Sequence, residues 1–258
     1  MRVGDEQPTW ATMEPAGDGS GHDISLGDAE VHVWRARLDR SPGEVQLLNL
    51  TLAAVEHTRA ARLRSEQQRL RFISGRGILR SLAARYLACD PGQLQLNINQ
   101  HGKPVLADES LSFNLSHAGG FGLFAFALHR RIGIDVESAT RRVAVDRIAE
   151  RFLHESEASQ LRSLQSVEVR HRAFLRCWTR KEAYLKATGE GIAAGALSRF
   201  EVSVDPQLPA RLERVEADPD EAARWHLQDL PLEGTDFVGA VCAEGQNWRL
   251  CCFESEEV

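Results

Sequence analysis

The segment Ile132–Glu137 carries two carboxylates, Asp135 and Glu137, with one residue between them. On a β-strand alternate side chains share a face, which would place these two carboxylates about 7 Å apart, at roughly 3.3 Å per residue. Like charges so placed repel each other unless a cation lies between them. Mg²⁺ suits such a pair, because it typically takes one or two carboxylates and completes its shell with water and phosphate oxygens. The segment therefore predicts a magnesium site, with a solvated face on an edge strand as the alternative.

A second set of charged residues is spaced for one face of a helix. Trp178, Glu182 and Lys186 follow one another at intervals of four residues, and residues four apart are neighbours on a helix surface. Lysine is rare here, because only three of the 31 basic residues are lysines, at positions 103, 181 and 186. A lysine offers a compact point charge where an arginine offers a planar fork. This concentration favours a functional helix, and a surface Glu–Lys pair is the alternative.

A third segment, Ser112–Gly120, ends in Ser116, His117, Ala118 and two glycines. A strand that runs into paired glycines can bring backbone N–H groups and an imidazole close to an anion. Adjacent strand residues point to opposite faces, so Ser116 and His117 are poorly placed to act as a nucleophile and its base. A structural histidine is the alternative. Lys103 lies upstream in the turn Gly102-Lys-Pro.

Positive charge gathers in one stretch of an otherwise acidic chain. Between Arg59 and Arg85 there are eight arginines and one acidic residue, Glu66, although the net charge of the whole chain is −6. The local charge predicts a phosphate-bearing ligand, whereas the net charge argues against a general nucleic-acid binder.

The hydrophobic pattern predicts a mixture of helices and strands in which the strands cluster, which is typical of the α+β class. We expect helices over residues 50–87, with breaks near 64–65 and 74–77, and over 145–164 and 167–187. We expect strands at 29–38, 94–98, 111–115, 122–128, 132–136, 200–204, 225–227, 237–243 and 248–253. Residues 1–25 are interpreted as a flexible leader, 26–130 as a first half and 131–258 as a second half that carries the metal site. No internal repeat is visible by eye.

The chain is predicted to work in the cytoplasm. No apolar run approaches the roughly 18 residues of a membrane span, and the N-terminus lacks the pattern of a secretory signal. Five cysteines, at positions 89, 177, 242, 251 and 252, form no CxxC pair, so their spacing indicates neither a metal site nor a disulfide framework. We interpret them as small buried side chains in a reducing compartment.

Taken together, these segments resemble the 4′-phosphopantetheinyl transferases, specifically the larger type typified by the surfactin-synthetase-activating enzyme. The similarity spans about residues 59–191, over half of the chain, and each motif is specific mainly through its order and spacing relative to the others. The matching segments are Phe72–Arg80, Gly102–Pro104, Phe113–His117, Gly133–Glu137 and Trp178–Lys186. The larger type implies an α+β chain made of two similar halves related by pseudo-twofold symmetry, most simply a monomer.

The resemblance also implies roles for individual residues. Asp135, Glu137 and Glu182 would hold Mg²⁺, Glu182 would act as general base and Lys186 would stabilise charge on the transferring phosphate. The residues that would bind coenzyme A are Lys103, Ser116, His117, Lys181, Lys186, Arg59, Arg71 and Arg76. The substrates would be coenzyme A and an apo acyl or peptidyl carrier protein, and the products holo-carrier protein and 3′,5′-ADP.

Two other functions use the same residues differently. A magnesium-dependent hydrolase of a coenzyme A or nucleotide pyrophosphate would release its product into water without any carrier protein. A nucleic-acid or scaffold protein would use the arginine-rich helices, and its binding to RNA or DNA would be sensitive to salt.

Overall fold

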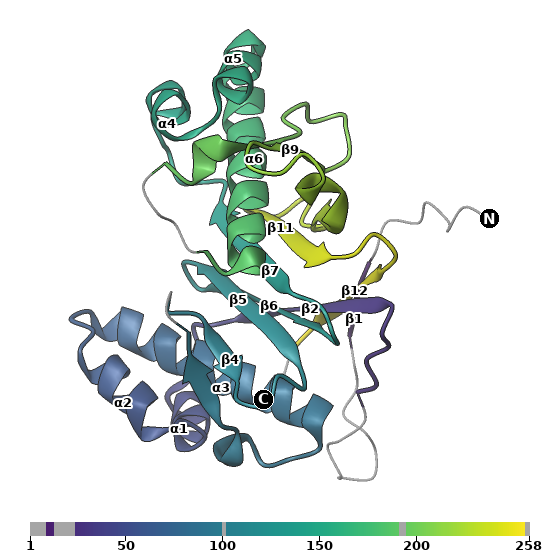
Figure 1. Ribbon diagram of the computed structural model, residues 1–258. Helices are drawn as coiled ribbons and strands as arrows, with labels where there is room; N and C mark the ends of the chain where they lie inside the picture. Colours follow the sequence, from purple (N-terminus) through teal and green to yellow (C-terminus); the bar gives the residue numbers. More distant parts are fainter. Residues whose placement is uncertain (1–8, 13–23, 100–101, 191–194, 256–258) are drawn as a thin grey trace.

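The computed structural model describes residues 9–12, 24–99, 102–190 and 195–255 (Figure 1). Two sheets lie at the centre, each covered on its outer face by one long helix, α3 (Glu66–Leu87) or α6 (Val167–Thr188). The first sheet has the strand order β1 (Trp10–Thr12), β12 (Arg249–Glu254), β2 (Glu30–Arg37), β6 (Phe121–Ala127), β5 (Ser112–Ala118). The second sheet has the order β10 (Trp225–Asp229), β11 (Phe237–Glu244), β7 (Ile132–Ser138). The α+β prediction is confirmed.

The remaining elements are short and lie around these layers. Helices α1 (Pro42–Leu50) and α2 (Ala54–Ala61) precede α3, and α4 (Val145–Phe152) and α5 (Glu155–Ser163) precede α6. Two small hairpins follow the long helices, each after a 3-10 turn. After α3 come the turn η1 (Pro91–Gln93) and the hairpin of β3 (Leu96–Ile98) and β4 (Pro104–Leu106). After α6 come the turn η2 (Leu197–Arg199) and the hairpin of β8 (Phe200–Val202) and β9 (Leu212–Val215). A further turn, η3 (Glu221–Arg224), precedes β10. None of the described helices is long and apolar enough to cross a membrane.

The second half of the chain repeats the element order of the first. In the first half, β2 is followed by three helices, a 3-10 turn, a small hairpin and the strands β5 and β6. In the second half, β7 is followed by the same series up to the strands β10 and β11, with η3 added. The strands also pair in the same order, β2-β6-β5 in the first half and β7-β11-β10 in the second. The serines that cap α3 and α6, Ser65 and Ser166, are 101 positions apart. So are the left-handed residues that end these helices, Ala88 (φ 48°) and Gly189 (φ 79°). The predicted duplication is therefore confirmed at the level of element order, strand pairing and helix ends.

Three apolar cores hold the layers together. One lies between α3 and the first sheet and includes Trp34 and Phe126. Another lies between α6 and the second sheet and includes Leu185 and Ala240. The third lies between the two sheets and includes Val33 and Ile134. Side chains on β2 and β7 alternate between two cores, so the outward face of each strand is turned toward its long helix.

Several sequence-based expectations need correction. Part of the predicted leader is structured, because β1 pairs in parallel with β12. The last strand, β12, pairs with β2 of the first half, so a division of the chain at residue 130 does not separate the two sheets.

The expected helix over 145–164 is two helices, because Leu153 has an extended backbone (ψ 166°) and His154 caps α5. The break expected near 74–77 is absent, and α3 runs through it. Gly77 lets α1 approach closely there, because a Cβ atom at this position would lie 2.6 Å from the Cβ atom of Leu48.

Candidate active site

A cavity of about 380 Å³ lies where the two halves of the chain meet. Its wall is formed by β5 and the Gly102–Pro104 turn of the first half and by α6 of the second half. The cavity is lined by six of the residues that the sequence predicts for the site, namely Arg76, Lys103, Ser116, His117, Glu182 and Lys186. The tertiary structure thus brings together residues that are up to 110 positions apart in the chain.

Asp135 is held at the edge of this cavity by two side chains from different halves. Its Oδ1 atom accepts hydrogen bonds from Lys186 Nζ at 2.6 Å and from Ser116 Oγ at 2.8 Å. Lys186 Nζ also donates to Ser116 Oγ at 3.0 Å. The other oxygen, Oδ2, is buried and has no hydrogen-bond partner among the described residues. A buried carboxylate oxygen without a partner is costly, so this atom is available for a cation.

Asn114 and Gly133 position Asp135, and the sequence reasoning missed both roles. Asn114 Oδ1 accepts a hydrogen bond from the Ile134 backbone N–H at 2.8 Å, which fixes β7 beside β5. A Cβ atom on Gly133 would lie 2.1 Å from the carbonyl oxygen of Ala183, so only glycine lets α6 come this close to β7. A lone glycine inside a strand pattern was the available signal, because it often marks a close backbone approach.

Glu182 faces the cavity from α6 in a setting that favours its neutral form. The side chain is buried, with 4% of the residue exposed. Burial and the nearby Asp135 carboxylate raise the pKa of Glu182 to about 7, although Lys186 acts in the opposite direction. A general base works best when its pKa lies close to the working pH, so Glu182 is suited to accept a proton.

Glu137 lies further along β7 and is partly neutralised by an arginine. Burial and the Asp135 carboxylate raise the pKa of Glu137, whereas Arg141, with Nη1 3.4 Å from Oε2, lowers it. Within the described part of the chain, Asp135, Glu137 and Glu182 do not each bring an oxygen within 4.8 Å of the other two. The residues nevertheless fit Mg²⁺, because oxygen ligands are what this ion takes and one Asp135 oxygen lacks a partner among the described residues. The Asp135 carboxylate also raises the pKa values of Glu137 and Glu182. A shared ion would require these side chains to move closer together.

Lys103 closes the cavity from the turn of the first half. Its Nζ atom donates to the carbonyl oxygens of Ile132 and Lys186, both at 2.8 Å, and so joins the first half to the start of β7 and the end of α6. Burial, with added repulsion from Lys186 and Arg131, lowers the pKa of Lys103 to about 8. Two of its three N–H groups are used by carbonyls, which leaves one for a ligand.

The predicted arginines fall into two groups. Arg76 lines the cavity, is 8% exposed and has one nitrogen, Nη1, that is buried and unpartnered among the described residues. Arg59 and Arg76 both lie over the ring of Phe72, at 5.6 and 5.5 Å from its centroid. Arg71 is bound instead to Asp39 through two hydrogen bonds of 2.7 and 2.8 Å. Arg76 is therefore the arginine best placed to meet an anion in the cavity.

His117 lies among positive charges. Burial lowers its pKa, as do Lys186, Arg71 and Arg76, whereas Asp135 raises it. The imidazole is therefore held neutral, which leaves it able to donate one hydrogen bond and to accept another.

The prediction that Lys181 binds coenzyme A is wrong in this structure. Its side chain is fully buried, and Nζ donates to both carboxylate oxygens of Glu157 at 2.7 Å and to the carbonyl oxygen of Phe200. Consecutive residues of a helix point about 100° apart, so the Lys181 side chain lies on a different face of α6 from Glu182.

The first half of the chain contains an equivalent buried ion pair, with arginine in place of lysine. Arg80 and Glu56 are each 101 positions before Lys181 and Glu157, and Arg80 Nε donates to Glu56 at 2.7 Å. Each glutamate is the third residue of a short helix and accepts a hydrogen bond from the backbone N–H of the residue before that helix, Ala53 or His154. Arg80 also donates to the carbonyl of Leu94, which follows η1 as Phe200 follows η2. Lys181 thus has a structural role, as the counterpart of Arg80.

Comparisons with known proteins identify the class to which this fold and site belong. The family model described as the 4′-phosphopantetheinyl transferase superfamily matches residues 131–242, and the model of a 4′-phosphopantetheinyl transferase N-terminal region matches residues 39–128. The chain therefore belongs to the 4′-phosphopantetheinyl transferase superfamily.

Individual relatives carry the same description. The chain is 38% identical, over 94% of its length and 97% of the relative's, to the 4′-phosphopantetheinyl transferase HetI of Nostoc sp.. It is 34% identical to the 4′-phosphopantetheinyl transferase psf-1 of Bacillus pumilus, over 67% of this chain and 70% of the relative. It is 29% identical to a phosphopantetheinyl transferase of Thraustochytrium sp., over 80% of this chain and 76% of the relative.

Proposed function

We propose that this protein transfers the 4′-phosphopantetheinyl group of coenzyme A to a serine of an apo acyl or peptidyl carrier protein, which gives holo-carrier protein and 3′,5′-ADP. The observation that carries the proposal is the cavity between the halves that Glu182 and Lys186 line, with Asp135 bound to Lys186 at its edge and one Asp135 oxygen unpartnered among the described residues. The transferase names of the relatives support the activity and give no support to the hydrolase alternative.

Asp135 and Glu182, with Glu137 beside them, would hold Mg²⁺. When bound, this ion would neutralise charge on the pyrophosphate of coenzyme A, which is the chief need of phosphoryl transfer. Charge balance supports this set, because the Asp135 carboxylate raises the pKa values of Glu137 and Glu182, and one divalent ion would relieve this repulsion.

Glu182 would act as the general base for the carrier serine, directly or through one water molecule. As its carboxylate takes the proton of the serine hydroxyl, the serine oxygen forms a bond to phosphorus and the bond from phosphorus to the departing 3′,5′-ADP breaks. Without the ion the pKa of Glu182 is raised to about 7, and a bound Mg²⁺ would favour its ionised form, so the carboxylate would be ready to accept the proton.

Lys186 would stabilise negative charge on the transferring phosphate. Its Nζ atom already lies between Asp135 and Ser116, so its position is fixed before the ligand binds. Preorganised charge of this kind is typically worth about 10²–10³ in rate.

The remaining cations would bind the rest of coenzyme A. Lys103, Ser116 and His117 would contact the phosphates and adenosine from the first half, and Arg76, supported by Arg59 and Arg71, would meet the 3′-phosphate. Arg76 has the strongest support, since it lines the cavity with a buried nitrogen that lacks a partner among the described residues. Exposed arginines would also attract an acidic carrier protein.

We place this reaction in the cytoplasm and assign it to a monomer. All five cysteines are free, which suits a reducing compartment, and two similar halves already build one complete cavity from a single chain.

Incubation of the protein with coenzyme A, Mg²⁺ and a panel of apo carrier proteins, followed by intact mass measurement, tests the proposal. We expect a covalent gain of one phosphopantetheinyl group on at least one carrier. Asp135→Asn should abolish the gain, whereas Glu213→Gln, an exposed control on β9, should leave it unchanged. Consumption of coenzyme A in the absence of any carrier would instead establish hydrolysis.

A further inference from the structure

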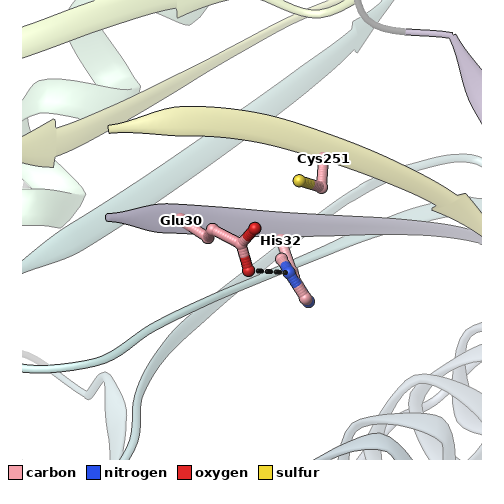
Figure 2. Close-up of side chains that lie close together, drawn as sticks. All are labelled: Glu30, His32 and Cys251. Atoms are coloured by element: carbon pink, nitrogen blue, oxygen red, sulfur yellow. Dashed lines mark hydrogen bonds and ion pairs between the residues drawn. The ribbon is translucent and has the colours of Figure 1, made fainter. Parts of the chain in front are cut away.

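A second cluster of potential metal ligands lies away from the cavity, on the first sheet. Glu30 and His32 share one face of β2, and Cys251 lies on the neighbouring strand β12 (Figure 2). One ligand atom from each residue lies within 4.8 Å of the other two, and no other such trio occurs in the ranges that the structure describes. The three donors are a carboxylate oxygen, an imidazole nitrogen and a sulfur.

Strand pairing fixes the backbone positions of this trio. β12 and β2 run parallel, with Cys251 opposite His32 and Arg249 opposite Glu30. These side chains point to the α3 side of the sheet, because the alternate residues Val31 and Val33 enter the core between the sheets. Ligands carried by two hydrogen-bonded strands keep their spacing without help from a loop.

The spacing of the first two ligands already suits a tetrahedral ion. His32 Nε2 and Glu30 Oε2 are 3.3 Å apart. A tetrahedral Zn²⁺ ion with bonds of about 2.0–2.1 Å to nitrogen and oxygen separates two such ligands by about 3.3–3.4 Å. An ion could therefore replace the hydrogen bond between them with little movement. The Cys251 sulfur lies within 4.8 Å of a ligand atom of each residue and would supply the third bond.

The far side of the imidazole is oriented as in many metal sites. His32 Nδ1 lies 2.9 Å from the Tyr86 hydroxyl, which also accepts a hydrogen bond from Trp34 Nε1 at 2.8 Å. A metal-ligating histidine nearly always donates its other N–H to a fixed acceptor, and this sets the ring orientation. Tyr86 supplies such an acceptor, so Nε2 is left to face Glu30.

From this geometry we infer that Glu30, His32 and Cys251 form a binding site for a thiophilic divalent ion, best matched by Zn²⁺. Mixed sulfur, nitrogen and oxygen donors favour zinc over Mg²⁺, which takes oxygen ligands. The Cys251 thiol would lose its proton to solvent on binding, and water would take the fourth position. The carboxylate, the thiolate and the divalent ion would sum to zero charge, and Arg249, which pairs with the other oxygen of Glu30, would add one positive charge.

The site has no equivalent in the second half of the chain, and the repeat explains the difference. The position 101 residues after His32 is Gly133, where the backbone of α6 fills the space that a side chain would need. In the first half that space holds an imidazole, and β12 adds the third ligand. The bound ion would tie the last strand to β2.

Cobalt binding to the full chain tests the inference without relying on activity. Metal-free protein is titrated with Co²⁺ in excess Mg²⁺, and the thiolate-to-cobalt charge-transfer absorption is recorded. We expect one Co²⁺ per chain with this absorption, its displacement by Zn²⁺, and a higher unfolding temperature when Zn²⁺ is present. The magnesium ligands in the cavity carry no sulfur, so they cannot produce this band.

Variants assign the ligands. Cys251→Ser should remove the charge-transfer band, and Tyr86→Phe should weaken cobalt binding about 10- to 100-fold through the imidazole. Cys89→Ser, which alters another half-buried thiol, should change neither. Transferase activity in Mg²⁺ shows that each variant is folded. Absence of the band in the parent protein at saturating Co²⁺, or its persistence in Cys251→Ser, overturns the inference.

Discussion

Replacing Glu182 by glutamine should stabilise the metal-free protein while removing its activity. The pKa of this carboxyl is raised from 4.5 to about 7 because it is buried beside the Asp135 carboxylate. One pKa unit corresponds to about 1.4 kcal/mol, so ionising Glu182 costs about 3 kcal/mol more in the folded chain than in the unfolded chain. Glutamine has the same shape and carries no charge, so it escapes this cost.

The effect depends on pH in a way that identifies its cause. Between about pH 4.5 and pH 7 the folded chain binds more protons at Glu182 than the unfolded chain does, so the free energy of unfolding contributed by this group falls as the pH rises. Below that range both forms of the protein carry a neutral side chain. The glutamine variant should therefore exceed the parent by about 3 kcal/mol near pH 8 and match it near pH 4.5.

Urea unfolding of both proteins, without metal, at these two pH values measures the difference. Glu213→Gln, an exposed change, serves as the control and should match the parent at both pH values. Added Mg²⁺ should stabilise the parent more than the variant, since an ion that binds only the folded state adds to its stability. A variant that is less stable than the parent near pH 8, or a difference that does not change with pH, would refute this account of Glu182.

Three further predictions concern the packing around the site. Gly133→Ala should destabilise the protein by several kcal/mol in urea unfolding, because the new Cβ would meet the Ala183 carbonyl at 2.1 Å, whereas Gly43→Ala has nothing within 4 Å and should not. Lys181→Met should cost about 3–5 kcal/mol by leaving the buried Glu157 carboxylate without a charged partner. The affinity of the folded fraction for coenzyme A, measured by calorimetry, should stay unchanged, and a loss of affinity would return Lys181 to the binding site. Lys103→Met should lower kcat as well as raise KM for coenzyme A, because the side chain holds the carbonyl of Lys186, and a change in KM alone would show that it acts only as a ligand.

Local pattern was enough to locate the main features of the site. Alternation in Ile132–Glu137 placed Asp135 on the outward face of a strand, and four-residue spacing placed Glu182 and Lys186 on one face of a helix. These inferences succeed because strand and helix periods are properties of a few consecutive residues. The resemblance of the ordered motifs then supplied the family, which the comparisons confirm.

Contacts between distant segments could not be predicted in the same way. The sequence by itself determined the α+β class, the two long helices and the acidic and basic residues around Asp135. Only the tertiary structure decided that Lys181 pairs with Glu157, that the last strand joins the first sheet, and that His32 and Cys251 lie side by side. The physical reason is that burial and strand pairing depend on which surfaces meet in space, and residues some 200 positions apart meet through the packing of the whole chain.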